Sequence, residues 1–171
     1  MTKESDILAE LLALKQKLFR LALRITQNRE EAEDIVEDVL VKAWERRAEW
    51  DQLKSLEAFV TTMCRNLAID RMDLHERRNA SLDDSHLQTP DVQRSPHEQL
   101  ERDERMNVVK QLMAQLPEKQ RSVLHLRDVE GKSTEEVALV LQTTEANVKV
   151  LLYRARLFIK TAYLKIENYG L

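Results

Sequence analysis

Glycine and proline are scarce in this chain, which has two glycines and three prolines among 171 residues. β-Sheets need such residues in the turns between strands, so their scarcity favours long helices with few tight hairpins. Ala, Leu, Glu, Lys and Arg are abundant and are good helix formers. Apolar residues make up 43% of the chain, enough for a core, and the length allows one domain or two small ones. We therefore predict an all-α protein.

Apolar residues at helical spacing predict three helices in the first half, over residues 7–25, 30–47 and 56–78. Ser5 or Asp6 can cap the first helix, and Ser55 can cap the third. Residues 49–54 are predicted to be a connecting loop. The first half is thus predicted to be a small helical bundle.

Four further helices are predicted in the second half from their start and stop signals. The signals are capping boxes at Ser95 and Ser133, Pro96 at the first helical position, Pro117 at a helix start, Gly131 as a stop, and Thr143 or Thr144 as a cap. They predict helices over 96–115, 118–128, 135–141 and 145–166. Residues 80–94 have no helical period and contain several helix breakers. We predict a domain at 1–79, a flexible linker at 80–94, and a helix-turn-helix domain at 95–171, with the two domains joined loosely.

The last predicted helix has the pattern of a recognition helix. Its inward face is apolar: Val148, Leu151, Leu152, Ala155, Phe158, Ile159 and Ala162. Lys149, Arg156 and Lys160 form one flank, and Asn147 and Arg154 form the other. A DNA-reading helix needs an apolar back, polar side chains near its start and cations for phosphates. An ordinary amphipathic surface helix would show the same pattern.

Charge is segregated, although the formal net charge is only −3. Residues 29–38 hold six acids against one arginine, whereas residues 145–165 hold five cations against one glutamate. Two such patches suggest two partners, one of them nucleic acid. The acidic face could be merely solvated or could dock a basic partner. A carboxylate metal site in a helical bundle requires Glu-x-x-His pairs. The histidines of this chain do not pair with the acidic segment in that spacing, so no metal is expected.

Several other function classes are disfavoured. Cys64 is the single cysteine, so neither an internal disulfide nor a cysteine zinc cluster can form. Two glycines do not make a phosphate-binding loop, and Cys64 has no histidine nearby in sequence. We expect no catalysis, cofactor or small-molecule substrate. No apolar run approaches the roughly 18 residues of a membrane span, and no signal peptide is evident, so a cytoplasmic protein without membrane insertion is expected.

The sequence resembles the extracytoplasmic-function (ECF) sigma factors in four segments that occur in order. Residues 32–44, Ala-Glu-Asp-Ile-Val-Glu-Asp-Val-Leu-Val-Lys-Ala-Trp, resemble the helix that binds the polymerase clamp. Residues 59–71, Phe-Val-Thr-Thr-Met-Cys-Arg-Asn-Leu-Ala-Ile-Asp-Arg, resemble the promoter-melting helix. Residues 116–121 with 128–138, and residues 147–149 with 153–156, resemble the domain that reads the minus-thirty-five element. Nearly the whole chain is covered.

The resemblance implies a transcription initiation factor whose partners are core RNA polymerase, promoter DNA and an anti-sigma factor. The implied polymerase-binding residues are Asp34, Glu37, Asp38, Val41 and Lys42. The implied minus-ten residues are Arg65, Asn66, Asp70 and Arg71, helped by the 49–54 loop. The implied minus-thirty-five residues are Thr144, Asn147, Lys149, Val150, Arg154 and Arg156.

The chain departs from the family pattern at a few positions. Phe59 stands where Trp is frequent, Asp73 where Arg is frequent, and Val150-Leu151 where Ser-Arg is usual, which alters the expected base contacts. Gln142 replaces the usual glycine of the helix-turn-helix. Two other functions stay open: a helix-turn-helix regulator that needs no polymerase, and an adaptor that binds only protein. The outward apolar residues Tyr153 and Leu157 are candidate anchors for a protein that clamps both domains or for the polymerase itself.

Overall fold

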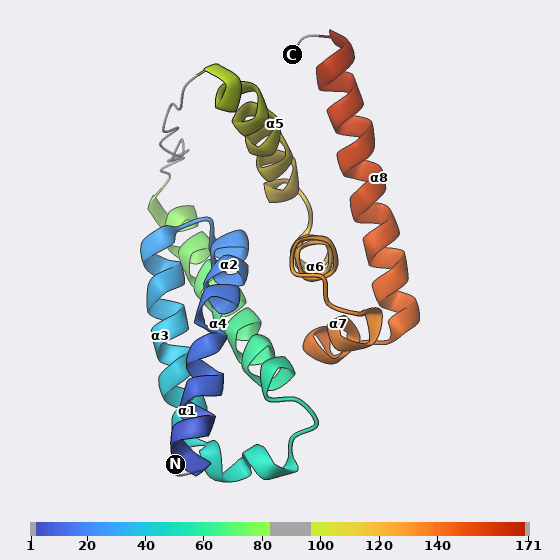
Figure 1. The fold of residues 1–171 in the computed structure, drawn as a ribbon. Coiled ribbons are helices and arrows are strands. Elements are labelled where there is room, and N and C mark those ends of the chain that lie inside the picture. Colours follow the sequence, from blue (N-terminus) through green and yellow to red (C-terminus); the bar gives the residue numbers. More distant parts are fainter. Residues whose placement is uncertain (1–2, 83–96, 170–171) are drawn as a thin grey trace.

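The computed structural model describes residues 3–82 and 97–169, and its side chains are described for residues 4–78 and 103–168. Every regular element within these ranges is helical, which confirms the all-α prediction (Figure 1). The elements are α1 (Lys3–Ala13), α2 (Lys15–Thr26), α3 (Arg29–Glu45), η1 (Arg47–Gln52), α4 (Leu56–Leu82), α5 (His97–Ala114), α6 (Glu118–Leu124), η2 (His125–Val129), α7 (Thr134–Leu141) and α8 (Glu145–Tyr169).

The first four helices form an N-terminal bundle in which α2 packs against both α3 and α4. Its core consists of aliphatic side chains with Cys64: Leu11, Leu18, Leu21, Ile25, Ile35, Val36, Val39 and Val60. Asn28 starts α3 by accepting a hydrogen bond from the amide of Glu31 at 3.0 Å, and Glu30 and Glu31 favour the positive end of the helix dipole. Capping and burial thus fix the orientation of α3, which carries the acidic face.

Three local predictions differ from the structure. The helix predicted over 7–25 is two helices interrupted at Leu14, although no glycine or proline marks the break. The loop predicted over 49–54 begins as the 3₁₀ helix η1. Helix α4 runs to Leu82, a few residues into the segment predicted as linker. The remainder of that segment and the Ser95 capping box lie outside the described residues.

The C-terminal unit comprises α5, α6, η2, α7 and α8, with α8 packed on α5, α6 and α7 (Figure 1). Both predicted caps form: Ser133 accepts from the amide of Glu136 and Thr144 from the amide of Asn147, each at 3.1 Å. Between them, α7 ends at Gln142, which adopts a left-handed conformation with φ 55°. The helix-turn-helix therefore forms its tight turn with glutamine in place of glycine.

The two units are in direct contact, whereas the sequence analysis expected them to be joined loosely. Helix α2 contacts α6 and η2, and α4 contacts α7. Thr62 on α4 approaches the carbonyl of Val140 on α7, with 3.5 Å between the two oxygens. The surfaces that meet are formed by segments far apart in the sequence. Buried apolar side chains of both units belong to one hydrophobic cluster, and ion pairs such as Arg65–Glu118 and Arg20–Glu130 also cross the contact.

Candidate nucleic-acid and protein interfaces

Helix α8 presents the predicted recognition residues to solvent. Its apolar back is buried through Val148, Leu152 and Ala155. The six predicted minus-thirty-five residues are all exposed: Thr144, Asn147, Lys149, Val150, Arg154 and Arg156. Phe158, predicted to face inward, is instead 39% exposed. The start of α8 can therefore approach a partner without any rearrangement of its own unit.

These residues differ in how their polar groups are engaged. Thr144 caps α8, and the side-chain amide of Asn147 donates to Oγ1 of Thr143 at 2.9 Å. Arg156 forms a two-point ion pair with Asp128, at 2.9 and 2.5 Å, and its hydrogen bond to Asp128 raises the pKa of Arg156. No ion pair is recorded for Lys149 in the part of the chain that the structure describes. Lys149 is therefore more available than Arg156 for contact with a partner.

Helix α3 displays the predicted polymerase-binding residues along one side. Asp34, Glu37, Val41 and Lys42 are exposed, and Asp38 is partly exposed. Val41 is 57% exposed although it is aliphatic, and charged residues surround it on the helix. An exposed aliphatic residue within a charged face is a common feature of protein-binding surfaces, where an apolar centre has a polar rim.

The acidic face is not free of partners, contrary to what its outward spacing suggested. Arg71 of α4 donates to Asp38 at 2.7 Å, to Glu31 at 3.2 Å, and also to Asp34. Burial lowers the pKa of Arg71, but the hydrogen bonds to Asp34 and Glu31 outweigh it and the pKa is raised. Arg71, which is a predicted minus-ten residue, is thus hydrogen-bonded to Asp34 and Asp38, which are predicted polymerase-binding residues.

The predicted minus-ten residues fall into two environments. Asn66 and Asp70 are exposed and lie one helical turn apart on α4. Arg65 is only 7% exposed and forms a two-point ion pair with Glu118 of α6, at 2.6 and 3.1 Å. In this conformation Arg65 cannot reach a DNA strand, whereas Asn66 and Asp70 can.

The segment between α3 and α4 is held in place by aromatic contacts. Trp50 in η1 is buried and donates from Nε1 to the carbonyl of Ala43 at 3.0 Å. The guanidinium of Arg46 lies 5.0 Å from the ring centroid of Phe59, and that of Arg47 lies 4.5 Å from the ring centroid of Trp44. These contacts hold η1 near the start of α4. The predicted strand-binding loop, residues 49–54, begins within η1.

An apolar groove of about 400 Å³ lies between α5 and α8. Val109, Met113, Ile159, Tyr163 and Leu164 line it, together with the Asp128–Arg156 pair. On the exposed side of α8, Tyr153 is 68% exposed and Leu157 is 50% exposed. The candidate anchors predicted for a protein partner are thus at the surface.

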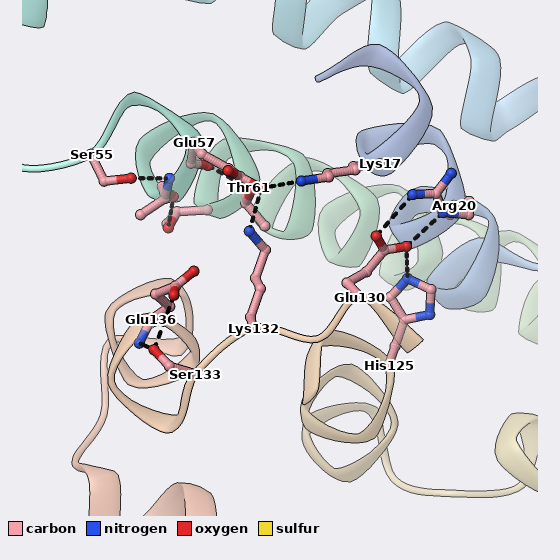
Figure 2. Close-up of polar contacts among 12 residues, drawn as sticks. Lys17, Arg20, Ser55, Glu57, Thr61, His125, Glu130, Lys132, Ser133 and Glu136 are labelled. Atoms are coloured by element: carbon pink, nitrogen blue, oxygen red, sulfur yellow. Dashed lines mark hydrogen bonds and ion pairs between the residues drawn. The ribbon is translucent and has the colours of Figure 1, made fainter. Parts of the chain in front are cut away.

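Sequence analysis missed the charged cluster between the two units. Glu130 accepts from Arg20 at 2.6 and 2.9 Å, and Lys132 donates to Glu57 at 2.6 Å (Figure 2). Arg24 donates from Nε to Nδ1 of His125 at 3.2 Å. Arg20 and Glu130 are 110 positions apart, so no local spacing pattern links them.

The described residues form neither a metal centre nor a membrane-spanning helix. No group of three or more His, Cys, Asp or Glu side chains in them is placed to hold a metal ion. None of the helices in the two described ranges is long and apolar enough to cross a membrane. Burial raises the pKa of the Cys64 thiol to about 12, which suits a core residue rather than a nucleophile.

Comparison with known protein families gives two matches that account for both units. Residues 11–78 match the family described as Sigma-70 region 2, and residues 106–159 match the family described as Sigma-70, region 4. The first match covers α3 and most of α4, which carry the acidic face and the predicted minus-ten residues. The second covers the helix-turn-helix.

Individual relatives are similar over most of this chain. It is 30% identical to the RNA polymerase sigma-H factor of Pseudomonas aeruginosa, over 86% of this chain and 81% of the relative. It is 31% identical to the ECF RNA polymerase sigma factor SigL of Mycobacterium tuberculosis, over 81% of this chain and 77% of the relative. It is 30% identical to the "Probable RNA polymerase sigma factor RfaY" of Xanthomonas campestris pv. campestris over 90% of this chain, but spans only 39% of that longer relative.

Two solved structures have the same fold. The sigma factor RpoE of Bartonella quintana, solved in complex with the anti-sigma factor NepR, matches with a TM-score of 0.74 and 24% identity, over 91% of this chain and 95% of that one. CnrH, solved in complex with the cytosolic domain of CnrY, matches with a TM-score of 0.65 and 21% identity, over 93% of this chain and 88% of that one.

Proposed function

Because the chain belongs to the ECF RNA polymerase sigma factors, we propose that it binds core RNA polymerase, directs it to particular promoters and helps to open the DNA there. The observation that carries this proposal is the joint presence of two exposed surfaces on one chain. One is the acidic face of α3 with Val41 at its centre, and the other is the start of α8 with Lys149 and Arg154.

The acidic face of α3 is the proposed docking surface for the polymerase. Negative charge for a basic partner comes from Asp34, Glu37 and Asp38. Val41 supplies an apolar contact from which water is excluded on binding. Lys42 stands at its edge. The buried residues of α3 hold this face at the bundle surface.

Promoter DNA is proposed to contact both units. Asn66, Asp70 and Arg71 on α4 would hold the opened minus-ten strand together with Arg65 and residues 49–54. The unstacked bases of that strand need polar pockets and cations. The exposed residues at the start of α8 would enter the duplex at the minus-thirty-five element. The polymerase performs the chemistry, and this chain performs none.

An anti-sigma factor is proposed as a further partner. RpoE of Bartonella quintana, which shares the fold, was solved with such a protein bound. Tyr153 and Leu157 on α8 and the groove between α5 and α8 offer apolar contacts for it. We place all these interactions in the cytoplasm, where a bacterial polymerase works on its DNA.

A regulator that acts without polymerase is not favoured. Such a protein would need only the helix-turn-helix, yet the match to Sigma-70 region 2 covers residues 11–78. It would also bind duplex DNA tightly on its own. Binding of the isolated chain and of its complex with core polymerase to the same promoter duplex separates the two functions.

The proposed function is tested by run-off transcription with core polymerase on a library of genomic fragments. We expect defined transcripts only when both the chain and core polymerase are present. The informative variant is Glu37→Lys with Val41→Ser, because both side chains are exposed on α3. It should abolish the transcripts and weaken polymerase binding.

The matched control is Glu10→Lys with Leu12→Ser, which changes an exposed acid and an exposed aliphatic residue on α1 instead. It should transcribe like the wild type. If the wild-type chain yields no transcript from any fragment, the proposed function is wrong. If the α3 variant is as active as the control, the proposed docking surface is wrong.

A further inference from the structure

The outermost side chains in the first turns of α8 are mainly apolar. Ala146, Val150 and Tyr153 are spaced by four and three residues, so they share one side of the helix. That side lies opposite Val148 and Leu152, which are buried. Val150 is aliphatic and is nevertheless 45% exposed. The crest of α8, as we call Ala146, Val150 and Tyr153, therefore faces solvent.

Cationic side chains lie on both sides of this crest. Lys149 and Arg154 are exposed on opposite flanks, and no ion pair is recorded for either in the part of the chain that the structure describes. Arg156, by contrast, is held by Asp128. In B-DNA, phosphates border the major groove on both sides and base edges form its floor. An apolar crest between two cationic flanks therefore suits a helix that enters the groove with Val150 towards the bases.

A valine side chain can distinguish the bases in only one way. It has no hydrogen-bond donor or acceptor, so it cannot satisfy the polar edges of guanine, adenine or cytosine. Among the four bases, only thymine presents an apolar group in the major groove, the methyl group on C5. Contact of Val150 with any other edge would displace water from polar atoms without replacing its hydrogen bonds, which costs free energy. The chemistry of this side chain therefore selects thymine.

The position of Val150 is fixed by the helix that carries it. The cap from Thr144 and the burial of Val148 hold the start of α8 on its own unit. A β-branched side chain in a helix has one strongly preferred χ1 rotamer, so Val150 loses little side-chain entropy on contact. Leu151, the neighbouring departure from the family pattern, packs against the core and so does not share this role.

We propose that Val150 is a specificity-determining residue, which reads a thymine of the minus-thirty-five element through the C5 methyl group of that base. The proposal rests on the proposed function, because it takes α8 as the helix that enters the duplex. It goes further by naming the base and the group that is recognised. It also gives a consequence to the departure from the family pattern at this position, since the usual serine offers a hydroxyl where this chain offers two methyl groups.

A protein partner is better served by a different part of α8. Leu157 and Phe158 are adjacent and both exposed, so the apolar surface is broader there. Val150 is a smaller side chain that lies between the exposed cations Lys149 and Arg154. A small apolar contact between two cations fits a base in a phosphate-bordered groove, whereas a protein anchor needs a larger buried area. We therefore assign Val150 to DNA.

The test begins with selection of duplexes from a random-sequence library by the full-length chain, both alone and in complex with core polymerase. The selected duplexes should share a thymine at one position of the minus-thirty-five element. Replacing that thymine by deoxyuridine removes only the methyl group and should weaken binding about fourfold, the effect of losing one buried methyl group. The slope of log affinity against log salt should not change, because no phosphate contact is lost. Equal affinity for thymine and deoxyuridine at every selected position overturns the proposal.

A second pair of duplexes checks that the methyl group itself is recognised. The thymine is replaced by cytosine in one duplex and by 5-methylcytosine in the other, each paired with guanine. The methyl groups of thymine and 5-methylcytosine both lie on C5 in the major groove. The methylated duplex should therefore bind about fourfold more tightly than the unmethylated one. No gain from methylation overturns the proposal.

Protein variants then identify the residue that reads the methyl group. Val150→Ser should bind the thymine and deoxyuridine duplexes equally. The matched control is Leu139→Ser, which makes the same kind of change at an exposed aliphatic residue of α7 and should keep the fourfold difference. Circular dichroism checks the helicity of both variants. If the difference persists in Val150→Ser, another residue reads the methyl group and the proposal is overturned. The crest is then a protein contact if the same variant loses affinity for core polymerase.

Run-off transcription with the same proteins separates this inference from the proposed function. If the wild type directs transcription but binds thymine and deoxyuridine alike, the sigma activity stands and thymine reading by Val150 is wrong. If the chain selects a thymine whose methyl group matters while no transcript appears with core polymerase, thymine reading stands and the proposed function fails. If neither the chain nor its complex selects any sequence, both are overturned.

Discussion

Arg71 and Asp38 are joined by a hydrogen-bonded ion pair in which Nη2 of the arginine lies 2.7 Å from Oδ2 of the aspartate. The pair connects α4, which carries the proposed minus-ten residues, to the acidic face of α3. Glu31 and Asp34 share the same guanidinium. Changing Asp34 or Asp38 therefore alters two things, the charge of the proposed polymerase-docking surface and the restraint on Arg71.

Replacing Asp38 by Asn should weaken core polymerase binding several-fold while changing the free energy of unfolding by less than about 1 kcal/mol, because partly exposed ion pairs contribute little to stability. A pull-down titration with core polymerase and a urea titration measure the two quantities. Glu33→Gln is the control, since Glu33 is an exposed acid of α3 paired with Arg29 alone among the described ion pairs. Wild-type affinity in the Asp38 variant would contradict the docking role.

Lys149→Ala should weaken binding of promoter duplex by the polymerase complex, because Lys149 is exposed near the start of α8. If it meets a phosphate, binding weakens at all sequences and the slope of log affinity against log salt falls by about 1. If it meets a base edge, about 1–3 kcal/mol of discrimination is lost at one position. Lys165→Ala removes the same charge from the far end of α8. Equal effects from the two variants would mean that only total charge matters.

Helix starts and buried faces could be predicted from sequence because they depend on near neighbours. Ser133 and Thr144 cap their helices through amides three positions later, and Val148, Leu152 and Ala155 follow the helical period. The exposure of the predicted recognition residues on α8 followed directly from that period.

The pairs that restrain the candidate site could not be predicted in this way. Arg65 and Glu118 are 53 positions apart, and Arg71 and Asp38 are 33 apart. A periodic pattern says which side of a helix faces outward, but not which charged residue of another helix lies opposite. Arg65 therefore looked like a surface residue, whereas packing against α6 buries it.

Gln142→Gly should raise the free energy of unfolding by up to about 1 kcal/mol. Gln142 ends α7 with φ 55°, where a Cβ atom is sterically unfavourable and glycine is not. Urea denaturation measures the change. Gln111→Gly is the matched comparison, because Gln111 is exposed within α5, where glycine should cost about 0.5–1 kcal/mol. Destabilisation by both substitutions would show that the side chain of Gln142 contributes more than its backbone strain costs.

The folded chain should lose stability in mild acid because of His125. This side chain is fully buried, with Arg24 at Nδ1 and Glu130 near Nε2. Burial, followed by the charge of Arg24, lowers the pKa of His125 from 6.5 to about 4, although Glu130 acts in the opposite direction. The folded chain therefore keeps His125 neutral at a pH where the unfolded chain protonates it.

The stability contributed by neutral His125 is complete above about pH 6.5 and is lost as the pH falls towards about 4, at up to about 1.4 kcal/mol per pH unit. Urea titrations between pH 7 and 5 should show this slope. His125→Gln removes the titrating group and should flatten it. His75→Gln, which changes a half-exposed histidine on α4, should leave it in place. An equal slope in the His125 variant would mean that other groups cause the acid sensitivity.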